Sequence, residues 1–256
     1  LSFLMFKVCG HSDRKLPSSI AIYARTVLKN LSDGLALVML LLNISLAAEP
    51  VTLPQLKEET LGKYTRYFQD QSGTLTLVQA QQIFEASTAR KGSSNSISLG
   101  IDVAPVWMKF TIQNSSTSEQ IYRLSVDTPW LDYIDTWLVR NQRVVKHIQG
   151  GDAYPFDKRP MPYRYYAFEY PYAPGETEVF IRIETKGPMA IPIKFSSTEK
   201  AITRDIVNGY QYGLLYGIML ALALYNLVLY VFIRQKEYGL YSLYLTGFVL
   251  NSLSYT

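Results

Sequence analysis

The hydrophobic pattern of the chain separates two apolar segments near its ends from an alternating pattern between them. Residues 210–233 carry no charge and are followed at once by the polar run Arg234 to Glu237. A bilayer core about 30 Å thick takes roughly 20 apolar residues in a helix. We therefore expect a transmembrane region at 205–256, with a first helix at about 210–233 and a second from about 238. The alternative is a buried helical hairpin of a soluble protein, although a core helix seldom runs so long without a charge.

The other apolar segment, Leu35 to Leu46, has the length of a signal-peptide core, and Ser45-Leu46-Ala47 offers a small-x-small cleavage pattern. These features predict a leader and signal peptide at residues 1–48 and export of the chain from residue 49 onward. A retained N-terminal anchor is the alternative, because the leader is long. The chain begins at Leu1 instead of Met, so a start codon at Leu28 is a further possibility.

The region between them, residues 49–204, alternates apolar and polar positions as half-buried strands do. In Val106–Asn114 the even positions are apolar, and clusters of Gly, Pro, Asn and Ser separate this run from the others. The pattern predicts a mainly β fold, an antiparallel sandwich with jelly roll preferred over an immunoglobulin-like form, followed by transmembrane α-helices. A short helix is expected at Leu75–Ala86. The other apolar series are Tyr122, Leu124 and Val126; Val179, Ile181 and Ile183; and Ile191, Ile193 and Phe195.

Composition narrows the chemistry of the exported part. Five of the 25 basic and two of the 21 acidic residues lie in the leader, so the remainder is nearly neutral and has no basic stripe for nucleic acid. The single cysteine, Cys9, also lies in the leader, which leaves no disulfide or thiolate site. No nucleophile elbow or phosphate loop is present, and His147 reads as an ordinary strand residue. We therefore expect no catalysis by this chain, no cofactor and no metal site.

Aromatic residues point to binding instead of catalysis. They are dense between Trp130 and Tyr172, and aromatic faces stack on sugar rings. The predicted ligand-binding residues are Trp130, Arg159, Tyr163 and Tyr165, with Arg159 supplying a rigid fork of donors. The competing interpretation is that most of these rings are buried in the core and that Arg159 pairs with Asp152 to brace a long loop.

Several motifs together resemble one known family. The sandwich pattern followed directly by a tyrosine-rich span is similar to the seven-transmembrane receptors with diverse intracellular signalling modules, over about residues 62–256. The chain departs from that family in lacking the remaining helices and an output module. The matching motifs are Val106-Trp107-Met108-Lys109-Phe110 ending at Asn114, Gly151-Asp152 leading through Pro155-Phe156 to Arg159, Val179-Phe180-Ile181-Arg182-Ile183, and Ala223-Leu224-Tyr225-Asn226-Leu227.

The resemblance implies a bacterial sensor whose sandwich is similar to carbohydrate-binding modules and whose output is typically a diguanylate cyclase or histidine kinase. We expect a multi-pass protein of the bacterial inner membrane, with residues 49–204 periplasmic and the basic 234–237 loop cytoplasmic. The expected partners are a carbohydrate or other small polar ligand and the lipid bilayer, with a homodimer left open and no nucleic acid. The alternative function is a membrane-tethered carbohydrate-binding or adhesion module without signalling output.

Overall fold

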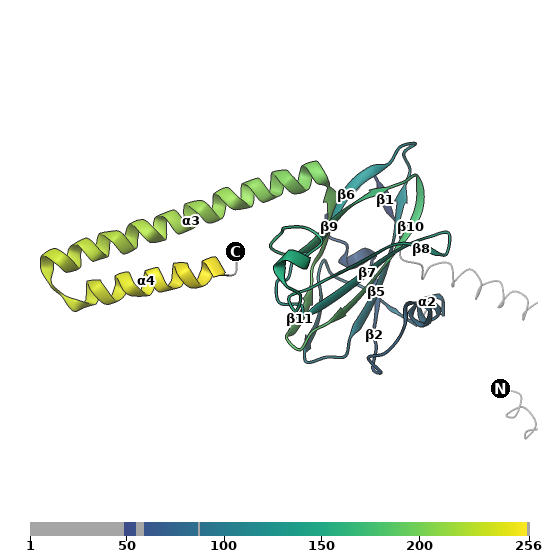
Figure 1. The fold of residues 1–256 in the computed structure, drawn as a ribbon, viewed down its shortest axis with the longest axis horizontal. Coiled ribbons are helices and arrows are strands. Elements are labelled where there is room, and N and C mark those ends of the chain that lie inside the picture. The colour runs from purple at the N-terminus through teal and green to yellow at the C-terminus, as the bar shows by residue number, and fades with distance from the viewer. Residues whose placement is uncertain (1–48, 55–58, 87, 255–256) are drawn as a thin grey trace, which may run out of the picture. The chain divides into compact units, whose positions relative to one another are not determined.

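The structure is a computed structural model that describes residues 49–54, 59–86 and 88–254. The predictions for the leader at residues 1–48 lie outside the described residues. A β domain precedes two helices along the chain (Figure 1). The elements are β1 (Val51–Leu53), η2 (Gly62–Tyr64), β2 (Arg66–Gln69), α2 (Leu77–Glu85), β3 (Arg90–Lys91), β4 (Ile97–Ile101), β5 (Val106–Asn114), β6 (Gln120–Val126), β7 (Tyr133–Arg140), β8 (Arg143–Gly150), η3 (Phe156–Lys158), β9 (Tyr166–Tyr172), β10 (Gly175–Glu184), β11 (Pro188–Ile191), β12 (Ile193–Ser197), α3 (Thr198–Ile233) and α4 (Lys236–Ser254).

The β domain is a sandwich of two layers. Among the described residues, the larger layer has the strand order β3-β2-β5-β10-β7-β8, with β1 beside β5. Its pairs are antiparallel except for β1 with β5. The facing layer consists of the β12-β6-β9 sheet and the β11-β4 pair. The predicted antiparallel sandwich is therefore confirmed, while its assignment to the jelly-roll form stays a prediction.

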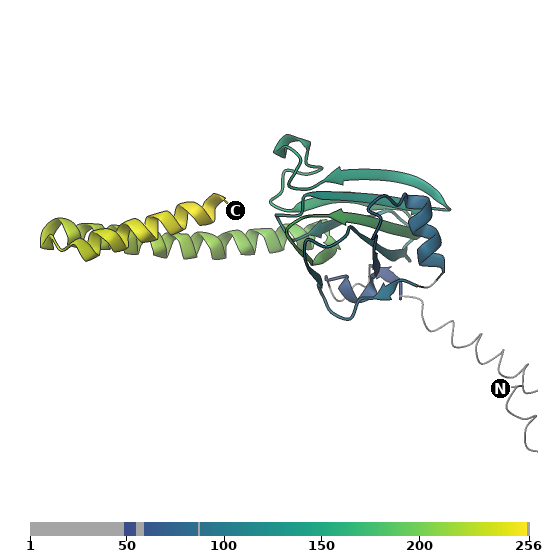
Figure 2. The ribbon, with the colours of Figure 1, turned by 90° about the horizontal axis from the view of Figure 1, so that it is seen from below.

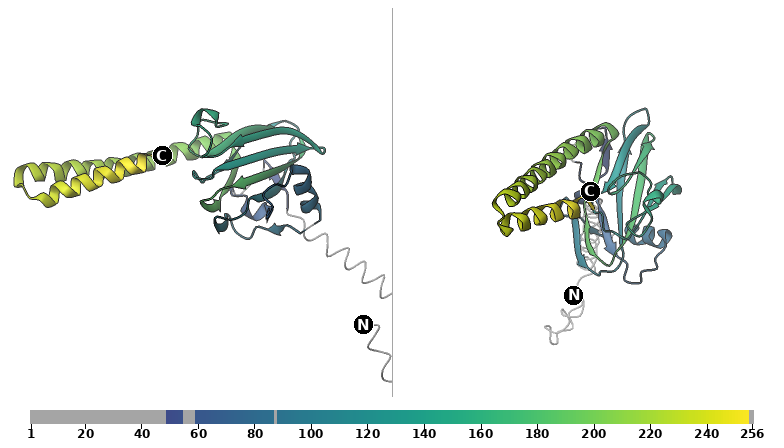
Figure 3. Two further views of the ribbon diagram at one scale, coloured as in Figure 1. Left: turned by 60° about the horizontal axis from the view of Figure 1, so that its bottom comes forward. Right: turned by 60° about the vertical axis from the view of Figure 1, so that its left-hand side comes forward.

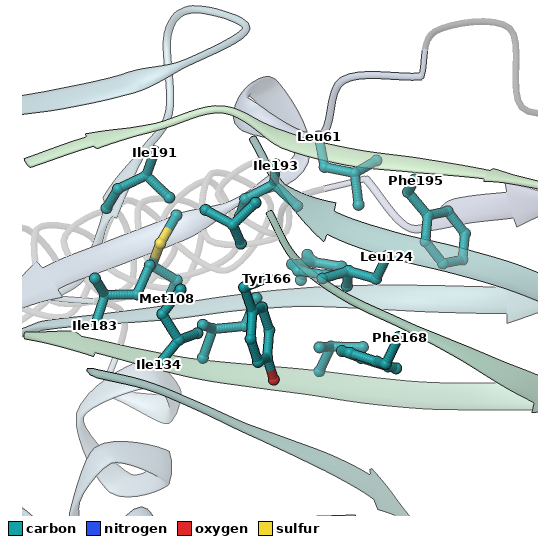
Figure 4. Packing of buried hydrophobic residues seen from close by; sticks show 14 of the residues in the cluster. Leu61, Met108, Leu124, Ile134, Tyr166, Phe168, Ile183, Ile191, Ile193 and Phe195 are labelled. Carbon is teal, nitrogen blue, oxygen red and sulfur yellow. The ribbon is translucent and has the colours of Figure 1, made fainter. Parts of the chain in front are cut away.

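The core forms where alternate side chains of the two layers meet. β5 spans the predicted Val106–Asn114, and its even positions are buried while Lys109 and Thr111 on the odd positions are only partly so. Burial of these apolar faces is the main force that holds the layers together. Figure 4 shows the facing side chains, which include Met108, Ile134 and Ile183 from the larger sheet and Leu124, Phe168 and Phe195 from the other.

The helix expected at Leu75–Ala86 is present as α2, which lies against the outer face of the larger sheet (Figure 2). A capping box between Thr76 and Gln79 starts it, because each side chain bonds the other residue's backbone N–H. Its Phe84 is buried and packs against Phe180 of β10, with ring centroids 5.9 Å apart. A second, smaller core therefore covers part of this face.

One predicted series is divided in the structure. The apolar positions at 191, 193 and 195 were expected to continue one strand, but the chain changes sheet at Pro192. Proline has no N–H to donate to a ladder, so it separates β11 from β12. Ile191 pairs with Ile97 of β4, whereas Ile193 pairs with Val126 of β6.

The helices α3 and α4 form an antiparallel pair (Figure 3). The Ser242 hydroxyl of α4 donates to the carbonyl oxygen of Ala223 in α3 at 2.8 Å. α3 has 36 residues and is long and apolar enough to cross a membrane. It begins at Thr198, twelve residues before the apolar segment that the sequence picked out, and Ser197 caps its N-terminus. The α-helix therefore follows β12 with no linker between them.

Candidate functional site

The loop between β8 and β9, residues 151–165, is held against the preceding β6–β7 loop. Asp152 N–H donates to the Leu131 carbonyl at 2.7 Å, and Ala153 N–H donates to the Asp132 carbonyl at 3.1 Å. Gly151 makes this approach feasible because its φ is +127° and a Cβ atom would collide with the Asp132 carbonyl. The β8–β9 loop is thus fixed at its start by backbone contacts.

Arg159 braces the same loop from within. Its guanidinium donates to the carbonyl oxygens of Tyr163 and Arg164, both at 3.2 Å, and lies 3.7 Å from the Asp152 carboxylate. It also stacks over the Phe156 ring at 5.0 Å. The pairing of Asp152 with Arg159, which the sequence offered as the alternative to ligand binding, is confirmed. Any ligand at Arg159 would share a guanidinium that already has these partners.

Tyr163 reaches the first turns of α3. Its hydroxyl donates to the Asp205 carboxylate at 2.8 Å, and the other Asp205 oxygen accepts from Arg123 of β6 at 2.6 Å. Arg123 is buried, lies over the Tyr163 ring and also donates to Glu169 of β9 at 2.9 and 3.0 Å. Burial and the bond to the Asp205 carboxylate raise the pKa of the Tyr163 phenol. We call Arg123, Tyr163, Glu169 and Asp205 the junction cluster.

A second contact with α3 lies one to two turns further along the helix. Arg164 sits over the rings of Tyr165 and Tyr212, at 5.1 and 5.5 Å, and Tyr165 meets Tyr163 edge to face. Burial raises the pKa of Tyr165. Because Tyr212 lies at the start of the uncharged 210–233 segment, the β8–β9 loop extends to the membrane end of α3.

Trp130 lies in the β6–β7 loop and is 47% exposed. Its indole N–H donates to the Pro188 carbonyl at 2.8 Å. A cavity between this loop and the β8–β9 loop is lined by Pro129, Asp152, Arg159 and other residues, but its volume is only about 10 Å³. That is room for at most one water molecule. A saccharide using Trp130 would therefore bind on the open surface of the two loops.

The four predicted site residues thus lie in two different loops and have different surroundings. The structure brings Arg159, Tyr163 and Tyr165 together in one loop and places Trp130 in the adjoining one. Tyr163 and Tyr165 face α3 instead of open solvent. Ligand binding by any of the four stays a prediction.

Sequence reasoning missed a polar and aromatic patch on the outer face of the larger sheet. Trp137 of β7 stacks on the His147 ring at 4.7 Å, and the Asp135 carboxylate bonds His147 at 3.0 Å and Gln149 at 2.8 Å. On its other face Trp137 stacks on Trp107 at 5.2 Å. Asp135 and Trp137 are two residues apart, as are His147 and Gln149, so each pair lies on one face of its strand. This spacing is visible in the sequence, but only the register of β7 with β8 shows that the two pairs face each other.

A β sandwich followed directly by a helix long and apolar enough to cross a membrane fits a membrane receptor with a sensor domain. Comparison with protein-family models agrees with this class. The model described as 7TMR-DISM extracellular 2 matches residues 62–197, and the model described as 7TM diverse intracellular signalling matches residues 209–256. The chain therefore belongs to the family of seven-transmembrane receptors with diverse intracellular signalling modules.

Other comparisons add little. No curated protein matches the chain. Among solved structures, the enzymatically active domain of tailspike protein 4 of bacteriophage CBA120 has 15% identity and a TM-score of 0.26, over 40% of this chain and 15% of its own. The CsCBM6-3 module of Clostridium stercorarium, solved with cellobiose, has 13% identity and a TM-score of 0.22, over 41% of this chain and 82% of its own. At such scores neither structure carries an argument about function.

Proposed function

We propose that the sandwich of this receptor senses a saccharide or similar polar ligand and passes the bound state to α3. The observation that supports transmission is the junction cluster, because Arg123 and Tyr163 of the sandwich both bond Asp205 of the helix. A module that only tethers a binding domain needs no such contact. Receptor signalling is therefore favoured over the tethered adhesion module.

The ligand class rests on the surface chemistry of the two loops. Trp130 offers a half-exposed indole, and a rigid aromatic face stacks on a sugar ring at little entropic cost. Arg159 would add charge-assisted bonds that fix orientation. Tyr163 and Tyr165 belong to the same loop as Arg159, so a ligand that shifts this loop would also shift the bonds to Asp205. Binding would then change the populations of two arrangements of the membrane helices.

The wider setting is proposed with it. Residues 49–204 lie in the periplasm, a signal peptide directs their export, and α3 is the first of several spans in the inner membrane of a bacterium. An output module, a diguanylate cyclase or a histidine kinase, reads the arrangement of the helices. The sandwich itself is proposed to be of the jelly-roll type.

The test uses the whole chain in lipid nanodiscs, with calorimetry over a panel of glycans and hydrogen exchange in residues 198–209. Trp130→Ala should weaken binding, and Tyr163→Phe should leave binding in place but abolish the ligand-dependent change in exchange. Lys146→Gln, in the distant part of β8, is the matched control. No ligand in the panel, or a loss of the roughly 3–5 kcal/mol of stability typical of a buried aromatic on Trp130→Ala, would overturn the ligand site. Binding without any change in residues 198–209 would overturn the signalling role instead.

A further inference from the structure

Within the described structure, Arg164 lacks some of the hydrogen-bond and charge partners that an arginine at this position needs. Its guanidinium stacks on two tyrosine rings, and its Nε atom is buried without a hydrogen-bond partner among the described residues. Over the described ranges of the chain no carboxylate pairs with it, although Arg159 pairs with one carboxylate and Arg123 with two. Arg164 as a whole is only partly buried, but a buried N–H donor without a hydrogen-bond partner is costly, so a partner outside the protein is expected.

The position of Arg164 along α3 indicates the nature of that partner. Tyr212, which it contacts, begins the apolar part of the helix, whereas Asp205 of the junction cluster lies about 10 Å further out at the rise of an α-helix. The polar headgroup layer occupies about 5–8 Å on each side of the hydrocarbon core. Tyrosines also favour this layer, and Tyr165 and Tyr212 flank Arg164 there. The guanidinium thus lies at the depth of lipid phosphates.

The rest of the β8–β9 loop has the composition of a membrane-contacting surface. Phe156 is 60% exposed, which is unusual for a phenylalanine, and Lys158 beside it is exposed as well. Arg159 links Phe156 to the Arg164 segment by its stacking and its carbonyl contacts. Asp157 lies between Phe156 and Lys158, and an exposed ring with Lys158 and Arg159 close by suits the boundary between headgroups and acyl chains.

We propose that the β8–β9 loop docks on the bilayer surface next to α3, with the Arg164 guanidinium bound to a phospholipid phosphate and Phe156 in the interfacial layer. Arginine presents parallel N–H donors that match phosphate oxygens in a bidentate geometry. The lipid then supplies the anion that the protein does not. This contact goes beyond ligand sensing, since it makes the bilayer itself part of the surroundings of the junction cluster.

The test places a fluorescent probe at position 156 through Phe156→Cys, with Cys9→Ser removing the native thiol, in nanodiscs that carry a headgroup-attached nitroxide. A probe placed through Val145→Cys is the matched control, because Val145 is comparably exposed but lies toward the far end of β8. The probe at 156 should be quenched several-fold more strongly than the probe at 145. Equal quenching at the two positions overturns the proposal.

A second arm tests the phosphate contact. Arg164→Gln should reduce the quenching at 156, with a larger loss in phosphatidylglycerol nanodiscs than in phosphatidylcholine ones, while Lys146→Gln changes nothing. One basic residue near an anionic surface corresponds to about a fivefold change in affinity. Arg164→Lys, which keeps the charge but not the bidentate donors, should lose less of the contact than Arg164→Gln. If Arg164→Lys loses as much as Arg164→Gln, or if free inorganic phosphate abolishes the quenching, Arg164 does not hold a lipid and the proposal fails.

Discussion

The junction cluster predicts a strong dependence of the first turns of α3 on Arg123. Replacing Arg123 with methionine keeps most of its volume but removes the donors to Glu169 and Asp205. Both carboxylates then lose their partner in a region where the arginine side chain was only 6% exposed. The sandwich and the start of α3 should both be destabilised.

The size of the effect depends on the exposure of the partners. Removing one member of a fully buried ion pair costs about 3–5 kcal/mol. Glu169 and Asp205 are 32% and 27% exposed, so water compensates part of the loss and about 2–3 kcal/mol is expected. Asp205→Asn leaves Arg123 bonded to Glu169, so it should cost only about 1 kcal/mol. A double-mutant cycle should return a coupling of about 1–2 kcal/mol between residues 82 positions apart.

The loss of stability on Arg123→Met can be measured by thermal unfolding of the whole chain in micelles, monitored by near-ultraviolet circular dichroism. At about 2–4 °C per kcal/mol, Arg123→Met should lower the melting temperature by roughly 4–12 °C. Lys109→Met is the matched control, because the Lys109–Glu178 pair is also partly exposed but does not touch α3. Hydrogen exchange in residues 198–209 should rise in the Arg123 and Asp205 variants alone. If Arg123→Met behaves like Lys109→Met in both measurements, the junction cluster does not join the sandwich to the helix.

Three further predictions concern the sandwich and can be checked by thermal unfolding. The Tyr166 hydroxyl donates to Thr136, whereas the Tyr172 hydroxyl is buried without a partner among the described residues. Tyr166→Phe should therefore cost about 1 kcal/mol of stability, while Tyr172→Phe should be neutral or stabilising. A larger loss for Tyr172→Phe than for Tyr166→Phe would contradict this. Gly151→Ala should cost more than about 1 kcal/mol because of its positive φ, and a wild-type melting temperature would refute that reasoning. Burial tends to raise the pKa of Asp70, but four hydrogen bonds outweigh it and lower the pKa below 3.8. The stability that ionised Asp70 contributes is therefore complete above pH 3.8 and is lost as the pH falls through the lowered pKa. In Asp70→Asn the melting temperature should consequently fall less between neutral and acidic pH than it does in the wild type.

Local patterns predicted most elements of the fold because each depends on neighbouring residues. The alternation in Val106–Asn114 coincides with β5, and the apolar positions of residues 75–86 correspond to α2. The absence of charge marks only the segment from residue 210 onward, whereas α3 already begins at Thr198, because residues 198–209 contain charged side chains and are still helical. Charged residues are excluded from the hydrocarbon core but not from the helical turns outside it.

The candidate site was harder to predict, because its contacts join distant parts of the chain. The ring of Tyr163 predicts a ligand contact, but its hydroxyl is bonded to a residue 42 positions away on α3. In the sequence, Arg123 is only a polar position between the apolar Tyr122 and Leu124, and its buried pairing depends on how β6, β9 and the helix come together. A single sequence shows which residues can make such bonds and not which of them meet.

The direct connection between β12 and α3 determines how a conformational change in the sandwich could reach the membrane part of the helix. Ser197 ends the strand and caps the helix, so no flexible residue separates the sandwich from the span. A helix is stiff over this length, and residues 198–209 project about 18 Å at the helical rise. A shift of the β8–β9 loop that moves Asp205 must therefore turn or displace Tyr212 as well, because the same unbroken α3 carries both residues. In the proposed receptor the sandwich and the membrane end of α3 would therefore move together, whereas a domain on a loose tether would not pass on such a shift.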